Sequence, residues 1–245
     1  MVRKPLRTKW NPLVDYKPIS DSPGTKFSRD LTRRYITKDA RRMIDLGCGT
    51  GGFIYAFDEH YHCFGLDLDL NALKVAKRYC VNSEFVVASV LNLPFRDEIF
   101  DFTATWGVME ELEDGDEIKL IDEINRILTS GGLFLLSTAN DHILFKLTNP
   151  ASLLHRYSHY NAKRLTKSLE ERKFSIEECT IRGRWYSLIA ISIFYFYKHI
   201  LHKPEGRILR YVHKKIEKEF ESTKKGVYSI YLAAKKEGGG KLTKG

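Results

Sequence analysis

The sequence has little cysteine and no pair of closely spaced cysteines. Four cysteines, Cys48, Cys63, Cys80 and Cys179, are spread over 245 residues without a C-x-x-C motif. Zinc sites and disulfide frameworks usually show such pairs or a dense cysteine pattern. We therefore expect buried, reduced thiols and no metal site.

Long apolar runs are also missing. The longest, residues 188–197, is closed by Lys198 and is half of the roughly 20 residues that a membrane-spanning helix needs. Residues 1–10 are basic, but no apolar run follows them, so we expect no secretory signal there. We expect a cytoplasmic protein, and peripheral contact with a membrane surface stays open.

The charges are unevenly distributed along the chain. With 43% hydrophobic and 29% charged residues, the composition excludes a mainly disordered chain. The net charge is +9, yet residues 43–140 contain six basic and seventeen acidic residues, so the two flanks together carry +20. Such a separation of charge indicates which partners the protein attracts and how charged ligands are steered to it, and it says little about the fold.

The first half alternates between short strands and helices. Helical patterns at residues 72–79 and 117–128 separate apolar runs, and Gly131-Gly132 is interpreted as the end of the second helix. Strands joined by helical crossovers predict an α/β fold, a doubly wound and mostly parallel sheet. The predicted strands are Arg42–Leu46 and residues 62–66, 84–88, 100–105 and 133–137.

The second half has a different rhythm. A helix is predicted over residues 161–172, with strands over 174–180 and 227–234. Residues 181–226, called the cap below, are too long for a simple connection and contain an amphipathic helix over 208–220. We expect an N-terminal helical segment (1–41), a core (42–180), the cap (181–226), a last core strand (227–237) and a disordered tail (238–245).

A glycine-rich loop follows the first predicted strand, and a helix is predicted over residues 53–57. Gly47, Gly49 and Gly51 permit positive φ and close approach of a ligand. Counting Gly52, the spacing also fits G-x-G-x-x-G, so a dinucleotide-binding oxidoreductase is an alternative. Against it, Asp45 would place a carboxylate beside the pyrophosphate, which favours a cationic ligand instead.

Five motifs in order resemble the class I S-adenosylmethionine-dependent methyltransferases, in particular the group that includes quinone and small-molecule methyltransferases. They are residues 45–51, Asp67, Leu93-Pro94-Phe95 with Phe100-Asp101, residues 106–112, and residues 126–132. The resemblance implies a Rossmann-like, seven-stranded sheet with an antiparallel last strand in 227–234, a helical insertion before that strand, and S-adenosyl-L-methionine as cofactor.

The resemblance also implies the cofactor-binding residues. Asp67 is expected at the ribose, Ser89 and Val90 at the adenine, and Trp106 and Gly107 at the methionine part. Ser89 stands where the family usually has an Asp, so a neutral oxygen would meet the adenine amino group. The remaining expected contacts are Asp45, Gly47, Cys48, Gly49, Gly51 and Leu68.

Each of these residues also has a purely structural interpretation. Asp45 could cap the helix after the loop, Asp67 could be a solvated acid at a strand end, and Trp106 could belong to the core. Cys48 is interpreted as a small packing residue. Asp69 is a weaker ribose candidate, because it is also placed to cap the next helix.

Catalytic candidates follow the fourth strand. Glu110 and Glu111 stand where the family often has a His, and His155, His159 and Tyr160 are alternatives. A base is needed only if the acceptor atom must lose a proton. The structural alternatives are acids stabilised at a helix N-terminus and solvated surface histidines.

The basic, aromatic parts outside the sheet are expected to choose the acceptor: Trp10, Tyr16 and Phe27, residues 140–160, and the cap. The first hypothesis is a methyltransferase for a small-molecule or lipid-like acceptor, with residues 188–221 able to rest on anionic lipid. The second is an RNA methyltransferase that uses the basic flanks. The third is a protein that binds the cofactor without transferring a methyl group.

Overall fold

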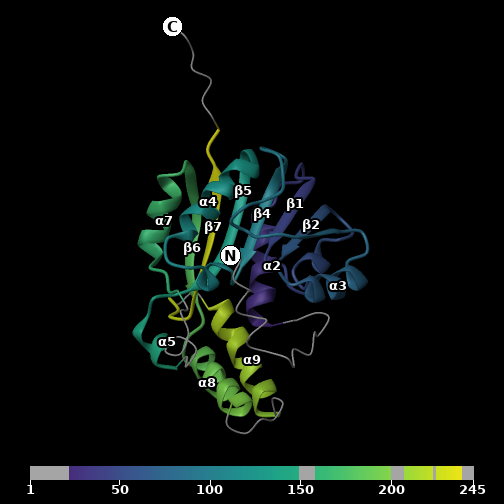
Figure 1. Cartoon of the computed structure of the whole chain (residues 1–245). Helices are drawn as coiled ribbons and strands as arrows, with labels where there is room; N and C mark the ends of the chain where they lie inside the picture. The colour runs from purple at the N-terminus through teal and green to yellow at the C-terminus, as the bar shows by residue number, and fades with distance from the viewer. Residues whose placement is uncertain (1–21, 149–157, 200–206, 223–224, 239–245) are drawn as a thin grey trace.

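A computed structural model describes residues 22–148, 158–199, 207–222 and 225–238 (Figure 1). Trp10, Tyr16, His155 and most of the tail lie outside the described residues, so the predictions made for them are not addressed. Seven strands form one sheet in the order β3-β2-β1-β4-β5-β7-β6. They are β1 (Arg42–Leu46), β2 (His62–Asp67), β3 (Glu84–Val87), β4 (Phe100–Trp106), β5 (Leu128–Ala139), β6 (Phe174–Arg182) and β7 (Ser229–Lys236).

The sheet confirms the predicted fold class. Strands β1 to β5 pair in parallel, whereas β7 runs antiparallel between β5 and β6. The cap contributes two helices before β7. The helices are α2 (Pro23–Tyr35), α3 (Leu70–Tyr79), α4 (Asp116–Ile127), α5 (Ile143–Thr148), α7 (Ala162–Glu170), α8 (Trp185–His199) and α9 (Arg207–Glu221), with short turns η1 (Ile54–Ala56) and η2 (Met109–Glu111).

Alternating side chains of the strands build a core on each face of the sheet. On β7, Leu232 packs into one core with Ile124 of α4 and Leu169 of α7. Its neighbour Tyr231 packs into the other, with residues of α2, α3 and α9. Phe27 of α2 lies 4.7 Å from the Tyr231 ring, so it contributes to this packing.

Several sequence-based assignments need correction. The predicted helix at 53–57 is only the short turn η1, and Phe53 offers no side-chain cap to its backbone while its ring packs on Trp106. Gly131 and Gly132 do not end a helix but lie within β5, and Gly131 has φ +76°. There the pairing with β4 jumps from Leu128 to Leu133, a bulge that glycine accommodates.

The cysteine prediction is confirmed at three positions and wrong at the fourth. Cys48, Cys63 and Cys80 are buried and free, whereas Cys179 is exposed. Cys179 lies on β6, which forms the edge of the sheet and is therefore less covered.

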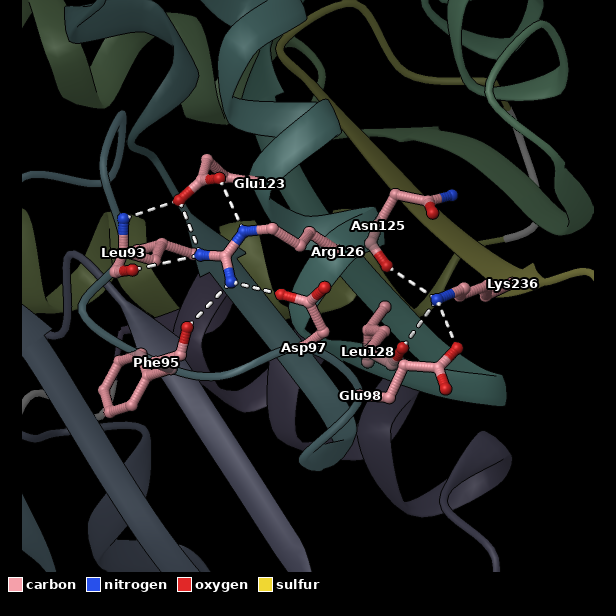
Figure 2. A network of polar contacts seen from close by, with 9 residues as sticks. All are labelled: Leu93, Phe95, Asp97, Glu98, Glu123, Asn125, Arg126, Leu128 and Lys236. Carbon is pink, nitrogen blue, oxygen red and sulfur yellow. Dashed lines mark hydrogen bonds and ion pairs between the residues drawn. The ribbon is translucent and has the colours of Figure 1, made fainter.

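Two of the sequence motifs meet in one polar network (Figure 2). The Arg126 guanidinium on α4 donates to the main-chain carbonyls of Leu93 (3.0 Å) and Phe95 (2.7 Å) and pairs with Glu123 and Asp97. The Glu123 carboxylate also accepts from the Leu93 N–H at 2.7 Å. The network thus holds the loop after β3 against α4.

In the part of the chain that the structure describes, no helix is long and apolar enough to cross a membrane. Helix α8, which contains the longest apolar run of the sequence, has 15 residues.

Candidate functional site

The site lies where the order of the strands reverses. From β1 the chain passes to β2 and β3 on one side, and then crosses to β4 on the other side of β1. Ligands of open α/β sheets bind in the crevice outside the carboxyl ends of the strands at such a point. The glycine-rich loop follows β1 there, and residues 107–110 follow β4.

Gly47 lets these two segments approach each other. It has φ +75°, and a Cβ at this position would lie 2.4 Å from Cγ2 of Val108, which follows β4. The N–H groups of Gly47 and Cys48 both donate to the Leu66 carbonyl, which fastens the loop to β2. Any larger residue at position 47 would therefore displace one wall of the crevice.

Asp45 is a buried carboxylate in need of a partner. It is 2% exposed, and within the described residues its Oδ1 has no hydrogen-bond partner. Burial and the neighbouring Asp67 hold its pKa well above the usual value. Asp45 therefore does not act as a helix cap through Oδ1, and a cation beside it would relieve the cost of its burial.

Asp67 ends β2 and holds two backbone segments. Its Oδ2 accepts from the Gly49 N–H at 2.8 Å and its Oδ1 from the Asp69 N–H at 2.9 Å. A carboxylate has about four acceptor positions, so two remain for ligand hydroxyls. Asp69 caps α3 by accepting from Asn71 and Ala72, as its structural interpretation predicted.

The segment after β3 contains Ser89 and Val90, the two residues predicted at the adenine. Ser89 is half-buried, and its Oγ accepts from the Leu91 N–H at 3.2 Å, a bond that leaves the hydroxyl proton to donate elsewhere. Val90 packs against the core from a half-buried position. Leu68 is 47% exposed after β2 and offers an apolar surface toward solvent.

Trp106 ends β4, and Gly107 follows it, on the opposite side of the crevice. In the described structure, the buried indole Nε1 of Trp106 has no hydrogen-bond partner, while the ring packs 5.2 Å from that of Phe53. Gly107 has φ +70°, and a Cβ there would lie 3.3 Å from Oε1 of Glu110. The buried Cys48 thiol has its pKa raised, first by burial and then by Asp45 and Asp67, which suits a packing residue rather than a nucleophile.

The two acidic catalytic candidates are placed differently. Glu110 is 8% exposed, and its Oε2 accepts from Thr138 Oγ1 of β5 at 2.9 Å. Glu111 is exposed to solvent. The structure therefore brings Glu110, not Glu111, to the inner side of this edge.

Tyr160 and His159 lie near Glu110. The Tyr160 hydroxyl donates to the Met109 carbonyl at 3.0 Å, and burial, followed by nearby carboxylates, raises its pKa. A phenol held in this way is a poor general base at neutral pH and instead positions η2. His159 packs edge-on against Phe145 of α5 at 5.4 Å.

Sequence reasoning missed Arg29. This half-buried residue of α2 donates from Nη2 to the Gly52 carbonyl at 2.6 Å and so braces the glycine-rich loop from outside the core motifs. No spacing pattern links two residues 23 positions apart, and only the packing of α2 on the sheet brings them together. Among the residues that the structure describes, no cluster of three or more potential metal ligands occurs.

The residues present fit S-adenosylmethionine. This cofactor carries a sulfonium and an ammonium group, which suit the unpartnered Asp45 oxygen, and two ribose hydroxyls, which suit the remaining acceptor positions of Asp67. The unpartnered Trp106 N–H offers a donor at the same edge. A pyrophosphate would instead meet the two neighbouring carboxylates, Asp45 and Asp67.

Comparisons with known proteins agree with this geometry. Residues 44–136 match a family model described as a methyltransferase domain. An uncharacterized protein of Methanocaldococcus jannaschii is 30% identical over 128 residues, which is 51% of this chain and 54% of that protein. Demethylmenaquinone methyltransferase of Geobacillus kaustophilus is 26% identical over 52% of this chain and 57% of its own length.

Another relative is the probable tRNA methyltransferase 9B of Bos taurus, which is 33% identical over 40% of this chain and 21% of its own length. Among solved structures, Haemonchus contortus phosphoethanolamine N-methyltransferase 2, in complex with phosphomonomethylethanolamine and S-adenosylhomocysteine, has a TM-score of 0.62 at 20% identity. That likeness covers 86% of this chain and 52% of the other.

The sheet and its helices have the Rossmann-like fold of the solved methyltransferase structure. Residues 44–136 match the model of a methyltransferase domain. The matched part of the chain spans about half to just under two thirds of the length of three M. jannaschii relatives (54%, 63% and 50%).

Proposed function

We propose that this protein is an S-adenosylmethionine-dependent methyltransferase acting on a small-molecule or lipid-like acceptor. The buried Asp45 oxygen that lacks a partner supports this proposal most directly, because it stands beside Asp67 at the strand switch point. The relative named as a demethylmenaquinone methyltransferase supports the acceptor class. Peripheral contact of residues 188–221 with a lipid surface is part of the proposal.

The residues divide the work between two sides of the crevice. The cofactor supplies a methyl group on a positively charged sulfur, open to in-line displacement. Asp45 and Asp67 hold the cationic and ribose parts, and Trp106 closes the wall beside β4. Glu110 faces the acceptor side, where it orients an acceptor or takes its proton.

The test is transfer of a labelled methyl group from S-adenosylmethionine to fractionated cell extract. We expect label in the lipid or small-molecule fraction, and none with Asp67→Ala. Glu110→Gln keeps the shape of the side chain and removes its charge, so it should retain cofactor binding and lose transfer if Glu110 serves the acceptor. Label in the protein fraction alone would contradict the proposed acceptor class.

An RNA acceptor is the second candidate function. It is favoured by the tRNA methyltransferase relatives, 33% identical over 101 residues, and by the +20 charge of the flanks. Label in the RNA fraction, with a steep salt dependence of RNA retention, would select it. Heat from S-adenosylmethionine and S-adenosylhomocysteine in calorimetry without any methyl transfer would identify a non-catalytic binding protein.

A further inference from the structure

Two neighbouring helices expose large apolar side chains on the same edge of the molecule. On α5, Ile143 is 64% and Leu147 67% exposed, one helical turn apart. On α8, Trp185 is 58% and Ile189 46% exposed, again one turn apart. We call these four residues the α5–α8 surface.

The helices that carry the α5–α8 surface pack on each other. Phe145 of α5 and Leu188 of α8 share a small core, and Ser192 Oγ donates to the Thr148 carbonyl at 3.3 Å. The buried side chains thus face each other, while the exposed ones cover no described part of the chain. Apolar residues grouped in this way mark an interaction site more often than scattered ones do.

The α5–α8 surface is held by a rigid support. The Glu219 carboxylate of α9 accepts from the N–H groups of Arg184, Tyr186 and Ser187 and so caps the start of α8. Helix α9 is itself anchored, because Ile216 and Phe220 are buried in the core beneath it.

The α5–α8 surface lies at the edge of the sheet that carries the candidate site. Helix α5 follows the carboxyl end of β5, and α8 follows that of β6, which runs in the same direction. Figure 1 shows α5 and α8 projecting together from this end of the sheet. A partner on the α5–α8 surface would therefore adjoin the acceptor side of the crevice.

The charge of the surrounding sequence indicates the partner. Residues 142–169 and 179–204, which contain both helices, have no Asp or Glu, but they have five and four Lys or Arg respectively. In the fold, Asp141 pairs with Lys146 and Glu219 caps α8, but the two stretches keep a net positive charge. Apolar side chains with a Trp in such a cationic setting are typical of an interfacial element on anionic lipid.

We infer that the α5–α8 surface docks on an anionic lipid bilayer and brings the acceptor side of the crevice next to it. This inference rests on the proposed function, because it supplies the route by which a lipid-like acceptor reaches the site. It also moves the contact from the amphipathic helix of the cap to α5 and the first turns of α8.

Vesicle co-sedimentation with the full chain tests the inference. We expect binding to vesicles of phosphatidylcholine with phosphatidylglycerol, and weaker binding to phosphatidylcholine alone. Leu147→Glu and Ile189→Glu should each lower the vesicle partition coefficient at least about tenfold. Each substitution removes apolar carbons that would insert into the bilayer and adds a negative charge that the anionic lipid repels. The matched control is Val81→Glu, which replaces an apolar residue 65% exposed near α3 by the same charge and should bind as the wild type does.

Three results would overturn the inference. The wild type could fail to bind anionic vesicles, or Val81→Glu could lose as much vesicle binding as the two test variants. In the third, Leu147→Glu would abolish RNA binding and leave vesicle binding unchanged. A concentration-dependent dimer that Leu147→Glu dissociates, without vesicle binding, would assign the surface to a second copy. Calorimetry with S-adenosylmethionine separates the two proposals. Cofactor heat without vesicle binding rejects only the docking surface, and vesicle binding without cofactor heat rejects only the proposed function.

Discussion

At the scale of single residues, Asp45 shows a conflict between stability and binding. We predict that Asp45→Asn weakens the affinity for S-adenosylmethionine by about 10- to 100-fold, since a hydrogen bond to a charged group contributes roughly 1.5–3 kcal/mol. Calorimetry measures this loss. Unchanged affinity would show that the unpartnered oxygen does not face the cofactor.

The same substitution should stabilise the cofactor-free protein. Because burial and Asp67 raise the pKa of Asp45 in the folded state, the unfolded state ionises first as the pH rises. The wild type therefore loses stability relative to Asp45→Asn from about pH 4 up to the raised pKa, and the difference is constant above it. Melting temperatures of both proteins across this range check the sign, and a gap that shrinks with rising pH would contradict it.

Arg29 gives a second prediction at this scale. Arg29→Met should weaken cofactor affinity about tenfold with little loss of melting temperature. The substitution removes the hydrogen bond from Arg29 to the Gly52 carbonyl, which holds the glycine-rich loop in place. The control is Arg33→Met on the same helix, which removes an exposed pair with Asp30 and should change affinity little. Equal effects of the two variants would mean that α2 acts only through general packing.

The residue scale also shows the reach of sequence reasoning. Asp45, Asp67 and Gly47 could be placed at the crevice because motif spacing and strand ends are local features of the chain. The choice between Glu110 and Glu111 could not, because it depends on Thr138 of a later strand. Arg29 depends in the same way on how α2 packs against the loop.

At the scale of elements, the Arg126 network connects two of the sequence motifs, Leu93-Pro94-Phe95 and residues 126–132. Arg126→Lys cannot make the bonds to Leu93, Phe95 and Glu123 together, so we expect a loss of about 1–3 kcal/mol in the free energy of unfolding. Cofactor affinity should fall as well, because Ser89 and Val90 lie in the loosened loop after β3. Urea denaturation and calorimetry measure the two effects.

The control for Arg126→Lys is Lys119→Met, on the same helix. Lys119 pairs only at the surface with Asp116, and its loss should stay within about 0.5 kcal/mol. Similar losses in both variants would mean that the network adds nothing beyond surface ion pairs.

Helices and strands were predicted well where the apolar periodicity is strong. They were predicted less well where glycines fit either a helix end or a β-bulge. The apolar steps of α4 and α9 and the strands of the sheet followed from patterns of 3.6 and 2 residues. In the sequence, Gly131-Gly132 is equally compatible with a helix cap and with a β-bulge. Only the pairing of β5 with β4, set by tertiary contacts, decides for the bulge.

At the scale of the whole molecule, the separation of charge coincides with the division of the fold. The net acidic segment, residues 43–140, contains the crevice, and the net basic flanks contain α2, α5 and the cap. The fold class was predictable from composition and strand order along the chain. The exposure of α5 and α8 was not, because an apolar helix reads as buried until its neighbours are placed.

This division predicts different salt dependences for the two sides of the reaction. Asp45 is 2% exposed, so salt should screen its interaction with the cofactor only weakly, whereas Lys and Arg side chains on the flanks are screened over a Debye length of about 8–10 Å. Raising the salt concentration from about 0.05 to about 0.3 M should therefore slow methyl transfer into an anionic acceptor fraction several-fold. The cofactor dissociation constant, measured by calorimetry under the same conditions, should change less than about twofold. Parallel changes in both quantities would show that the basic flanks take no part in selecting the acceptor.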